Sequence, residues 1–450
     1  MNTLKKLRPL DLRAGTACLV LALAAVGLGI YSNWYGVHVS LYTADPRGQI
    51  GPYESLVLRF SQPVQPGVVQ AGLTLDPPVP GKFDWQNDHT LLFLPGAPYS
   101  ARVTVRLTGP WLRKALSWKL AVRQELIVFL SSADPPRELM EVPAEGGKAR
   151  QLTFTGGKVF DFDTSPLGDQ IVYSQVNARN GLDLWLVGRD GGAARLLLAC
   201  GVDRCFSPAW SPDGRRIAYN RETAPSNPGG PLGASRLRIL DVSTGQDGPA
   251  FSDAQIIGSG DLWSPDGSWL ATYDGASSQI RVVNLSSGQQ VLLPSSLGLL
   301  GSWSPDSHTL VYPNPMTDSN QVTRTVIERA DFTSGEVGVF IGKASDANET
   351  EYDDAAWDPD GQHILLDVRL DPQLPDRQLW LFHPSSLDGT LIAHQAGYSY
   401  DFFRWDPGGM RLVVQATDLN QPFAPQIELW QADQGLKAVA ANGMFPRWLP

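Results

Sequence analysis

Apolar and polar residues follow one short pattern that recurs along most of the chain. "WSPDGRRIAY" begins at Trp210, and close copies begin at Trp263 and Trp303. Each copy places a Ser-Pro-Asp turn between two apolar stretches. Ser and Pro favour the first two positions of a type I turn, and a following Gly or similar residue supplies the positive φ that the turn needs. The pattern therefore predicts a β-hairpin at each copy, with the tryptophan at the end of the incoming strand.

Looser copies extend the repeat in both directions. They begin at Thr164 ("TSPLGDQIVY"), Trp357 ("WDPDGQHILL") and Trp405 ("WDPGGMRLVV"), and the chain ends in "WLP" from Trp448. Successive copies begin 40 to 54 residues apart, and after each hairpin come a third apolar stretch, a polar turn and a fourth stretch. A drifting period in the forties with four strands per repeat is typical of β-propeller blades.

The two ends of the repeat region are incomplete in complementary ways. Residues 126–153 supply a second, third and fourth strand without a first, and residues 444–448 supply a first strand without followers. The ends are therefore expected to complete one sheet together, which gives an all-β, seven-bladed propeller over residues 124–450 with no free sheet edge. The repeated tryptophans are expected to pack between blades.

The "WSPDG-x-x-I/L-A-Y" unit resembles the WD-like repeat of TolB-type β-propellers, which is also found in the propeller domains of prolyl-oligopeptidase-like peptidases. The resemblance covers residues 124–450 and implies the fold far more than it implies an activity. TolB proteins have six blades and a separate α/β domain. This chain has seven repeats and no such domain, and it lacks the length of a hydrolase domain.

Residues 38–123 alternate apolar and polar positions over several short stretches. Val103, Val105 and Leu107 share one face of such a stretch. Period-two alternation predicts a small β-sandwich. The segments "LRFSQPV" and "ARVTVRL" resemble bacterial Ig-like domains, which implies a spacer that lifts the next domain away from a membrane.

An uncharged apolar run lies near the N-terminus. Residues 1–13 carry four basic residues and one acid, and residues 14–35 carry no charge. About 18 apolar residues are close to the minimum for a membrane-spanning helix, and a basic flank favours the cytoplasm. The run predicts an uncleaved signal anchor, with a cleaved signal peptide as the alternative. The chain would then be a single-pass membrane protein whose propeller lies outside the cytoplasm, in the periplasm or at the cell surface.

Charge and cysteine content narrow the possibilities further. The net charge is −10, and the basic N-terminal flank makes the remainder more acidic still. Such a surface argues against nucleic acid as a partner. Cys200 and Cys205 either form a disulfide, which an extracytoplasmic location permits, or remain two small buried thiols.

The two faces of the expected propeller differ. The Ser-Pro-Asp turns are short, whereas second and third strands are joined by long connections at residues 222–234, 313–321, 370–376 and 417–424. Long connections on one face indicate a binding face, although tolerated surface variation gives the same pattern.

Connections between blades would form the rim of the central channel on that face. The acidic and aromatic residues expected at this rim are Asp161, Asp203, Asp261, Asp353, Asp354, Tyr398, Tyr400, Asp401 and Phe402.

These features favour a binding or scaffold protein. Acids and aromatics suit a protein or peptide partner with basic and apolar groups. The sequence has no hydrolase nucleophile, zinc-peptidase or P-loop motif. Its six histidines lack metal-ligand spacing, and Glu351, Asp353 and Asp354 lack the spacing of a calcium loop, so no cofactor or metal is predicted. The alternatives are a propeller enzyme, either a metal-assisted hydrolase or a lyase, and a subunit that presents substrates to an envelope peptidase complex.

Overall fold

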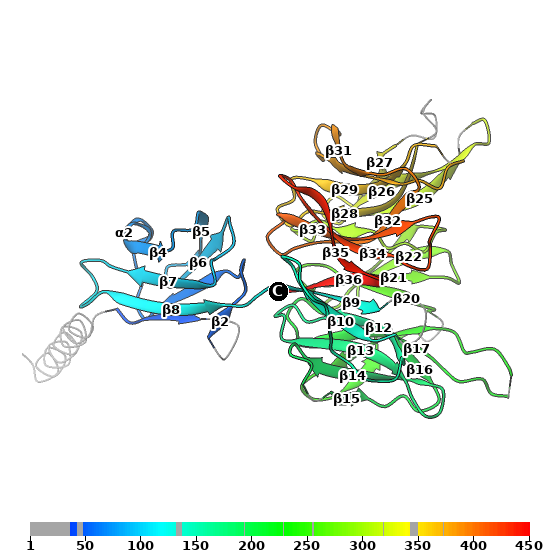
Figure 1. Ribbon diagram of the computed structural model, residues 1–450, viewed down its shortest axis with the longest axis horizontal. Helices are drawn as coiled ribbons and strands as arrows, with labels where there is room; N and C mark the ends of the chain where they lie inside the picture. Colours follow the sequence, from blue (N-terminus) through cyan, green and yellow to red (C-terminus); the bar gives the residue numbers. More distant parts are fainter. Residues whose placement is uncertain are drawn as a thin grey trace, which may run out of the picture. The chain divides into compact units, whose positions relative to one another are not determined.

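A computed structural model describes residues 37–450, apart from residues 43–47, 132–136, 193, 228, 254–255, 318, 343–349 and 372. The described chain is mostly β-strand and divides into two compact units, Met1–Val122 and Arg123–Pro450 (Figure 1). Within the described residues, no helix has the length and apolar character needed to cross a membrane. The anchor expected at residues 14–35 lies outside the described residues.

The first unit is a sandwich of two four-stranded sheets. One sheet has the order β1 (Val39–Tyr42), β3 (Leu56–Phe60), β6 (Thr90–Pro95), β5 (Gly81–Asn87), and the other β2 (Gln49–Ile50), β8 (Leu116–Val122), β7 (Arg102–Leu107), β4 (Leu73–Asp76). A short helix, α2 (Pro66–Gly72), precedes β4. Alternate residues of both sheets, such as Leu58 and Val105, share one buried core. The period-two pattern of the sequence is thus the inward and outward alternation of these strands.

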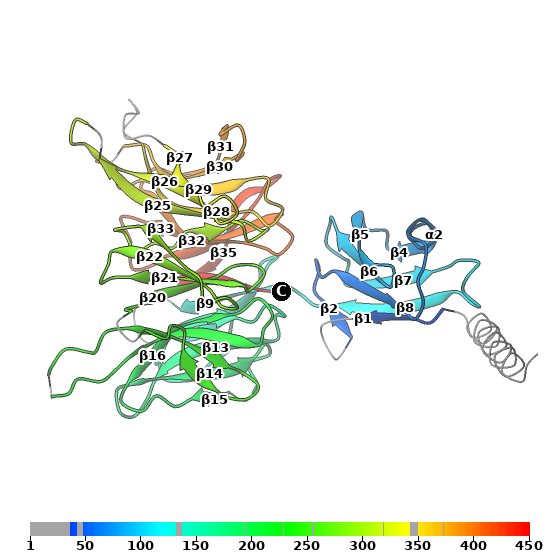
Figure 2. The same cartoon turned by 180° about the vertical axis from the view of Figure 1, so that it is seen from behind.

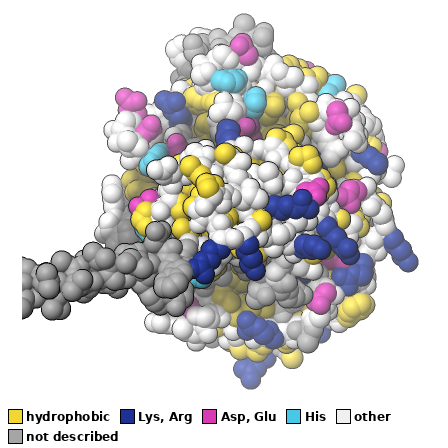
Figure 3. Space-filling model, turned by 90° about the vertical axis from the view of Figure 1, so that its left-hand side faces the viewer, with side chains coloured by type: hydrophobic (Ala, Val, Ile, Leu, Met, Phe, Trp, Pro, Cys, Tyr) yellow, Lys and Arg dark blue, Asp and Glu magenta, His cyan; other side chains and the backbone are white. Residues whose placement is uncertain are grey.

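The two units differ in the sign of their charge. Residues 37–122 contain eight Lys and Arg against five Asp and Glu, whereas residues 123–450 contain 24 against 40. Arg102, Arg106 and Lys119 are exposed on neighbouring strands β7 and β8. Lys and Arg side chains are prominent on the side of the molecule drawn in Figure 3. The acidity of the whole chain therefore belongs to the second unit.

The second unit is built from antiparallel four-stranded groups. One sheet has the order β11 (Arg150–Gln151), β10 (Leu139–Pro143), β9 (Leu126–Ser131), β36 (Gly443–Leu449). Four more follow chain order: β20 (Ser259–Trp263), β21 (Trp269–Asp274), β22 (Gln279–Asn284), β23 (Gln290–Pro294); β24 (Ser302–Trp303), β25 (Thr309–Thr317), β26 (Thr323–Asp331), β27 (Val337–Ile341); β28 (Glu351–Trp357), β29 (Ile364–Arg369), β30 (Gln378–Phe382), β31 (Gly389–His394); and β32 (Tyr398–Trp405), β33 (Arg411–Asp418), β34 (Gln426–Gln431), β35 (Gly435–Ala441).

An eight-stranded sheet contains two further groups of four. The first is β12 (Val159–Thr164), β13 (Gln170–Val176), β14 (Leu182–Gly188) and β15 (Arg195–Leu198), and the second is β16 (Arg204–Trp210), β17 (Arg216–Glu222), β18 (Arg236–Asp241) and β19 (Asp247–Pro249). A single parallel pair, Leu182 with Arg204, joins the two groups. Each group is otherwise the same antiparallel meander as the other sheets.

Side-chain hydrogen bonds fix the turn that the sequence repeats. Ser211 Oγ donates to Asp213 at 2.6 Å and accepts from the backbone N of Arg216 at 2.9 Å. Ser264 and Ser304 form the same pair of bonds in their own turns. One hydroxyl thus donates a hydrogen bond within the turn and accepts one from the backbone of the outgoing strand. A side chain that can both donate and accept hydrogen bonds is therefore favoured at this position.

The repeated tryptophans lie between neighbouring sheets. Trp263 Nε1 donates to the carbonyl oxygen of Ala209 at 3.2 Å, and Trp448 Nε1 donates to that of Arg404 at 2.9 Å. Each bond joins the first strand of one group to the first strand of the group before it. The tryptophan therefore sets the contact between neighbouring groups, in addition to the apolar area that it buries.

The last strand of the chain completes the sheet that begins the second unit. β36 pairs antiparallel with β9, with Leu449 opposite Leu126 and Met444 opposite Leu130, as the sequence predicts. Figure 1 shows β36, in red, beside β9, in cyan. The two ends of the unit are therefore held in one sheet, and β9 has no unpaired edge along this stretch.

One connection that the sequence predicts as irregular is instead a long hairpin. Residues 313–321 were expected to join second and third strands, but β25 continues through this segment to Thr317 and β26 begins just beyond it at Thr323. β24 pairs only with Leu310 and Val311 of β25. Beyond that point the described residues place no strand along one edge of β25, so Pro313 and Pro315 break no ladder bond on that edge. This hairpin and the connection between β17 and β18 project from the same side of the second unit (Figures 1 and 2).

Candidate functional site

The first strands of the groups line the middle of the second unit. β12 contacts β16 on one side and β36 on the other, β16 contacts β20, β24 contacts β28, and β32 contacts β36. Each first strand other than β36 runs from a connection between groups to a short turn that begins with Ser-Pro or Asp-Pro. Residues early in these strands therefore lie nearer the long connections, on what we call the loop face, and the short turns form the turn face.

A β-bulge interrupts several first strands three residues before the tryptophan. The strand register shifts at this place in β16, β32 and β36, where Ser207, Phe402 and Phe445 have φ values of 50°, 52° and 56°. β20 has Gly260, with φ of 72°, at the equivalent position. Positive φ is unfavourable for a bulky side chain, and such backbone is concentrated at functional sites. The rings of Phe402 and Phe445 meet edge to face, with 4.6 Å between centroids.

Four aspartates and two arginines occupy the same first strands, and we call them the inner-strand charge cluster. They are Asp161, Asp163, Asp261, Asp354, Arg404 and Arg447.

Hydrogen bonds hold two of these aspartates between neighbouring strands. Asp161 accepts hydrogen bonds from Ser174 Oγ and from the backbone N of Ser207, the latter at 2.6 Å. Asp163 accepts one from the backbone N of Trp210 at 2.9 Å and lies 3.7 Å from Arg447 Nε. These contacts join β12 to β16 and to β36, so both carboxyl groups are fixed by the strands on either side.

Burial dominates the electrostatics of the cluster. It raises the pKa of Asp161 to about 6 although Ser174 and Ser207 donate hydrogen bonds to it, and it also raises the pKa of Asp354 to about 6. Burial raises the pKa of Asp163, which Arg447 partly offsets. Burial and the like charge of Arg404 lower the pKa of Arg447 to about 10. Carboxylates held in this way are stabilised by an added positive charge, so the cluster favours a cationic group.

Asp261 is the most perturbed member of the cluster. Burial raises its pKa well above the ordinary value, and the neighbouring Asp163 and Asp161 raise it further. Its buried Oδ2 has no hydrogen-bond partner among the described residues. An ionised carboxylate in such a position costs stability, which a bound cation or loss of the charge would recover.

Asp261→Asn is therefore expected to stabilise the protein at pH 7.5. The folded-state pKa of Asp261 is raised, so wild-type stability falls as the pH rises from its unfolded value of about 4 through the folded value. Removing the charge should recover about 1–3 kcal/mol, which thermal unfolding of the full chain at pH 7.5 would measure as a higher Tm. At pH 5 the difference should shrink, because the raised pKa lets wild-type Asp261 hold its proton to a greater extent as the pH falls. An equal difference at both pH values would contradict this explanation.

A second group of charges, centred on Arg377, adjoins the cluster. Arg377 lies 2.6 Å from Asp367, 3.6 Å from Asp353 and 3.4 Å from Asp401. Asp353 also pairs with Arg369 at 2.8 Å. Asp367 is almost fully buried, and burial raises its pKa well above the ordinary value despite the nearby guanidinium. Asp353 and Asp401 are thus held by arginines of their own unit.

The remaining residues expected at the rim have structural roles. Asp203 accepts a hydrogen bond from Arg221 at 2.8 Å and one from the backbone N of Ala224 at 3.0 Å, and these bonds lower its pKa although burial opposes them. Tyr400 is buried in the core between β29, β32 and β33, and the half-buried Tyr398 packs against that core. Tyr400 was expected at the rim of the channel, but its side chain is buried between sheets, because the alternation of side chains along β32 directs it inward.

The disulfide left open by the sequence is present in the structure. Cys200 and Cys205 are bonded through their sulfur atoms, and both residues are buried. They flank Asp203, with Cys200 in the connection between β15 and β16 and Cys205 at the start of β16, on the loop face. The bond fixes the loop from which Asp203 reaches Arg221.

Large apolar side chains are exposed in several connections of the loop face. Phe154 is 82% exposed and Phe423 is 81% exposed, and both lie in loop-face connections. The other exposed large apolar residues in these connections are Val202, Leu232, Leu297, Leu299, Val322, Leu370 and Leu374, and Phe402 is exposed beside them on β32. Isolated exposed apolar residues are common, and Leu196, Val337 and Met410 are exposed away from this face. The two most exposed aromatic residues of the described chain nevertheless both lie in loop-face connections.

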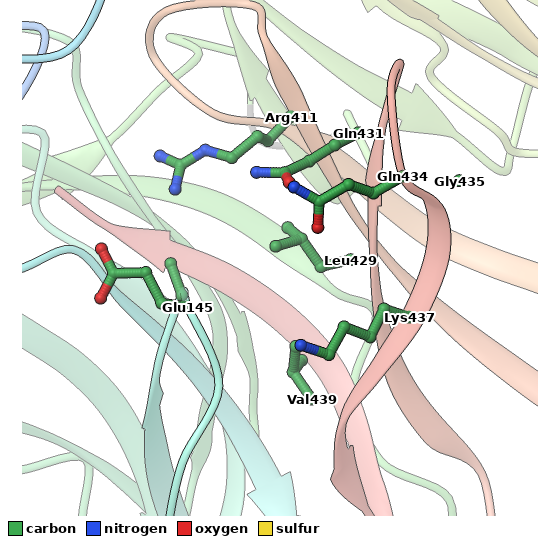
Figure 4. Close-up of a pocket in the computed structure, with 9 residues that line it drawn as sticks. Glu145, Arg411, Leu429, Gln431, Gln434, Gly435, Lys437 and Val439 are labelled. Atoms are coloured by element: carbon green, nitrogen blue, oxygen red, sulfur yellow. The ribbon is translucent and has the colours of Figure 1, made fainter.

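A cavity of about 230 Å³ lies elsewhere, between the β10–β11 turn and strands β33 to β35. Glu145, Arg411 and Lys437 contribute charged ends to its lining (Figure 4). Arg411 is already paired with Glu125 and Asp406. None of the residues expected at the rim lines this cavity, and its position among short turns places it away from the loop face.

Comparison with known proteins supports the fold. No family model and no curated protein matches the sequence. A mutant puromycin hydrolase in complex with PGG is 13% identical over 72% of this chain and 53% of its own, with a TM-score of 0.53. TolB from Acinetobacter baumannii is 16% identical over 85% and 84% of the two chains, with a TM-score of 0.44. A putative TolB from Agrobacterium tumefaciens is 20% identical over 55% and 84%, with a TM-score of 0.41. The puromycin hydrolase therefore shares a fold with a large part of this chain, and the successive four-stranded antiparallel sheets of the second unit are those of a β-propeller.

Several members of the site were not among the residues predicted from the sequence. Asp163, Arg404 and Arg447 each lie one residue before the start of a repeat copy, at Thr164, Trp405 and Trp448, and Phe445 lies three residues before Trp448. Aligning the copies on the tryptophan and comparing these two positions would have revealed them. Loop residues such as Asp203 were predicted because they lie in the connections between strands, whereas these residues lie within the strands themselves.

Proposed function

We propose that this chain is a membrane-anchored, extracytoplasmic binding protein. Residues 14–35 would anchor it, the sandwich would act as an Ig-like spacer, and a seven-bladed ring would present its loop face to a protein or peptide partner. The partner is expected to offer a basic group beside apolar side chains. The basic group would enter the middle of the ring near Asp161, Asp261 and Asp354, and the apolar groups would pack on the surrounding loop face.

The observation that carries this proposal is the pairing of exposed apolar residues with buried acids. The loop-face connections expose Phe154 and Phe423 almost completely, while the first strands hold carboxyl groups whose pKa values are raised by burial. A desolvated acidic centre inside an apolar surround is the pattern of an interface with a charged anchor residue. The strained backbone of Phe402 and Phe445 supports the same location, because strain of this kind persists where a side chain must be aimed.

A peptide library displayed on phage and selected against the purified full chain in detergent tests the proposal. Enriched peptides are expected to combine Lys or Arg with an aromatic or aliphatic residue. Phe402→Ser should weaken binding of a synthetic enriched peptide by about tenfold or more, as expected for loss of an aromatic at the centre of an interface. Met410→Ser is the matched control, because Met410 is an exposed apolar residue on the turn face.

Two results would count against the proposal. One is selection that enriches no basic and apolar peptide. The other is a peptide whose affinity falls equally in Met410→Ser and Phe402→Ser, since binding would then not depend on the loop face. Circular dichroism of both variants would establish that they remain folded.

A propeller enzyme is the second candidate, and one observation favours it. Asp161 and Asp354 have pKa values of about 6, which suits carboxyl groups that exchange protons near neutral pH. An enzyme would convert the selected peptides or related substrates, whereas a binding protein would release them unchanged. Mass spectrometry of bound peptide after prolonged incubation distinguishes the two.

A further inference from the structure

The turn at residues 358–363 departs from the other repeats in a way that points to a metal site. In the copies that begin with Ser211, Ser264 and Ser304, a neutral hydroxyl sits at the start of the turn and donates to an aspartate two residues later. Two copies, "WDPDGQH" and "WDPGGMR", place an aspartate at the start of the turn instead. That change puts a negative charge where the fold otherwise uses a hydroxyl.

Both aspartates meet a basic residue five positions later. Asp406 accepts hydrogen bonds from the backbone N of Arg411 at 3.1 Å and from its Nε at 2.9 Å. Asp358 accepts one from the backbone N of His363 at 3.0 Å, and its other oxygen lies 3.0 Å from His363 Nδ1. The two turns thus have the same geometry, but one is closed by a guanidinium and the other by an imidazole.

The two turns differ in their balance of charge. The Asp406 turn has Gly408 at its third position, so it adds no second acid there, and Arg411 is a permanent cation. The turn at Asp358 keeps a second acid, Asp360, and has only a histidine to oppose both. Asp358 is 7% exposed at its side chain, so water screens it poorly. A positive charge is therefore missing at this turn by comparison with its sister.

We propose that Asp358, Asp360 and His363 bind a first-row transition-metal dication, for which Zn²⁺ is the probe. One ligand atom from each of the three residues lies within 4.8 Å of the others. Asp360 is exposed, so a rotation of its side chain can shorten its distance to the other two ligands. Carboxylate oxygen and imidazole nitrogen are established zinc donors, and the imidazole disfavours Ca²⁺ and Mg²⁺, which prefer oxygen ligands.

A further imidazole lies close to this site. The ring of His383 meets that of His363 edge to face, with 5.9 Å between centroids. His383 belongs to the turn between β30 and β31, the next short turn of the same sheet. A metal held by Asp358, Asp360 and His363 would therefore lie close to a second turn of the same sheet on the turn face. This site is separate from the loop face, so the proposal stands or falls independently of the proposed function.

The test is a zinc titration of the full chain, purified without a histidine tag and stripped of metal with a chelator. Wild type is expected to bind one equivalent of Zn²⁺ and to gain thermal stability, as any ligand of the folded state confers. Asp360→Asn and His363→Gln should each weaken zinc binding by about tenfold or more. Asp306→Asn is the matched control, because Asp306 occupies the position of Asp360 in a serine turn, and it should leave zinc affinity unchanged.

A charge-replacement variant keeps the proposal testable if those variants fold poorly. His363→Arg copies the sister turn and supplies the missing cation, so the metal-free variant should unfold at a higher temperature than metal-free wild type. It should also lose the zinc response. Wild type that binds no Zn²⁺ at 100-fold excess over protein would overturn the proposal. So would zinc binding of equal affinity in wild type, Asp360→Asn and His363→Arg, since the metal would then be held elsewhere.

Discussion

Deletion of residues 443–450 is expected to abolish cooperative folding of the second unit while the first unit stays folded. The deletion removes β36, which leaves the edge of β9 unpaired between Leu126 and Ser131. It also removes Trp448 and Leu449, which are 6% and 0% exposed. Loss of each large buried side chain costs about 2–5 kcal/mol. The combined cost of losing two such side chains and the hydrogen bonds of one strand pair approaches the whole free energy of unfolding of a typical domain, about 5–15 kcal/mol. Tryptophan fluorescence during urea unfolding measures the loss, and limited proteolysis should leave a fragment ending near Val122.

A relocation variant shows whether ring closure, and not merely the lost residues, is responsible. Leu449 lies opposite Leu126 in the antiparallel pair, so residues 443–450 placed before Leu126 through a short Gly-Ser linker can form the same pairing as a hairpin. This variant should recover cooperative unfolding when the C-terminal copy is absent. If the deleted chain unfolds cooperatively at the wild-type urea concentration, β36 does not close the unit.

The hairpins and the closing strand were predictable because their information is local. A Ser-Pro-Asp turn between apolar stretches specifies its hairpin through bonds within six residues, as from Ser211 to Arg216. The pairing of β36 with β9 was predictable because each end of the repeat lacks what the other supplies. Local turn chemistry repeated many times thus determines a long-range contact between the two ends of the unit.

The site was predictable only in part because it depends on how separate strands meet. Asp261 is an ordinary acid in the sequence, and its raised pKa comes from burial beside Asp163 and Asp161 on another group. Likewise, nothing local to Arg377 indicates that it pairs with Asp367 and Asp401. The strained φ of Phe402 and Phe445 also lies beyond sequence reasoning, since aromatic residues disfavour that conformation.

Histidine spacing alone was a poor guide to the candidate metal site. The six histidines lack any pattern of paired ligands, so the sequence gives no reason to connect His363 with a metal. Comparison of the two aspartate turns supplies the reason, because Arg411 shows what the same geometry does with a permanent cation. Differences between copies of a repeat are thus more informative about chemistry than the repeat itself.

Arg411→Ala is expected to destabilise the second unit far more than removal of the matched arginine in another copy. Arg411 pairs with Glu125 and, at 2.9 Å, with Asp406, and both acids are buried. Its guanidinium also lies over the ring of Trp448, 4.9 Å from the centroid. Removing one partner of a buried ion pair costs about 3–5 kcal/mol, because the remaining charges are left uncompensated. Urea unfolding of the full chain at pH 7.5 would measure this loss.

Arg216→Ala is the control that separates the ion pairs from the aromatic contact. Arg216 occupies the same position in its own copy and lies 4.9 Å from the ring centroid of Trp263, but its turn begins with Ser211 where the other has Asp406. Its removal should cost about 0.5–1 kcal/mol, the usual contribution of an exposed cation–π contact.

The pH dependence of the stability lost in Arg411→Ala gives a second check. Burial raises the pKa of Asp406 to about 6, and loss of Arg411 raises it further, so the stability lost in Arg411→Ala should be smaller at pH 5, where Asp406 is protonated, than at pH 7.5. Equal losses in the two variants, or a loss in Arg411→Ala that does not change with pH, would mean that packing against the tryptophan and not charge holds the ends of the unit together.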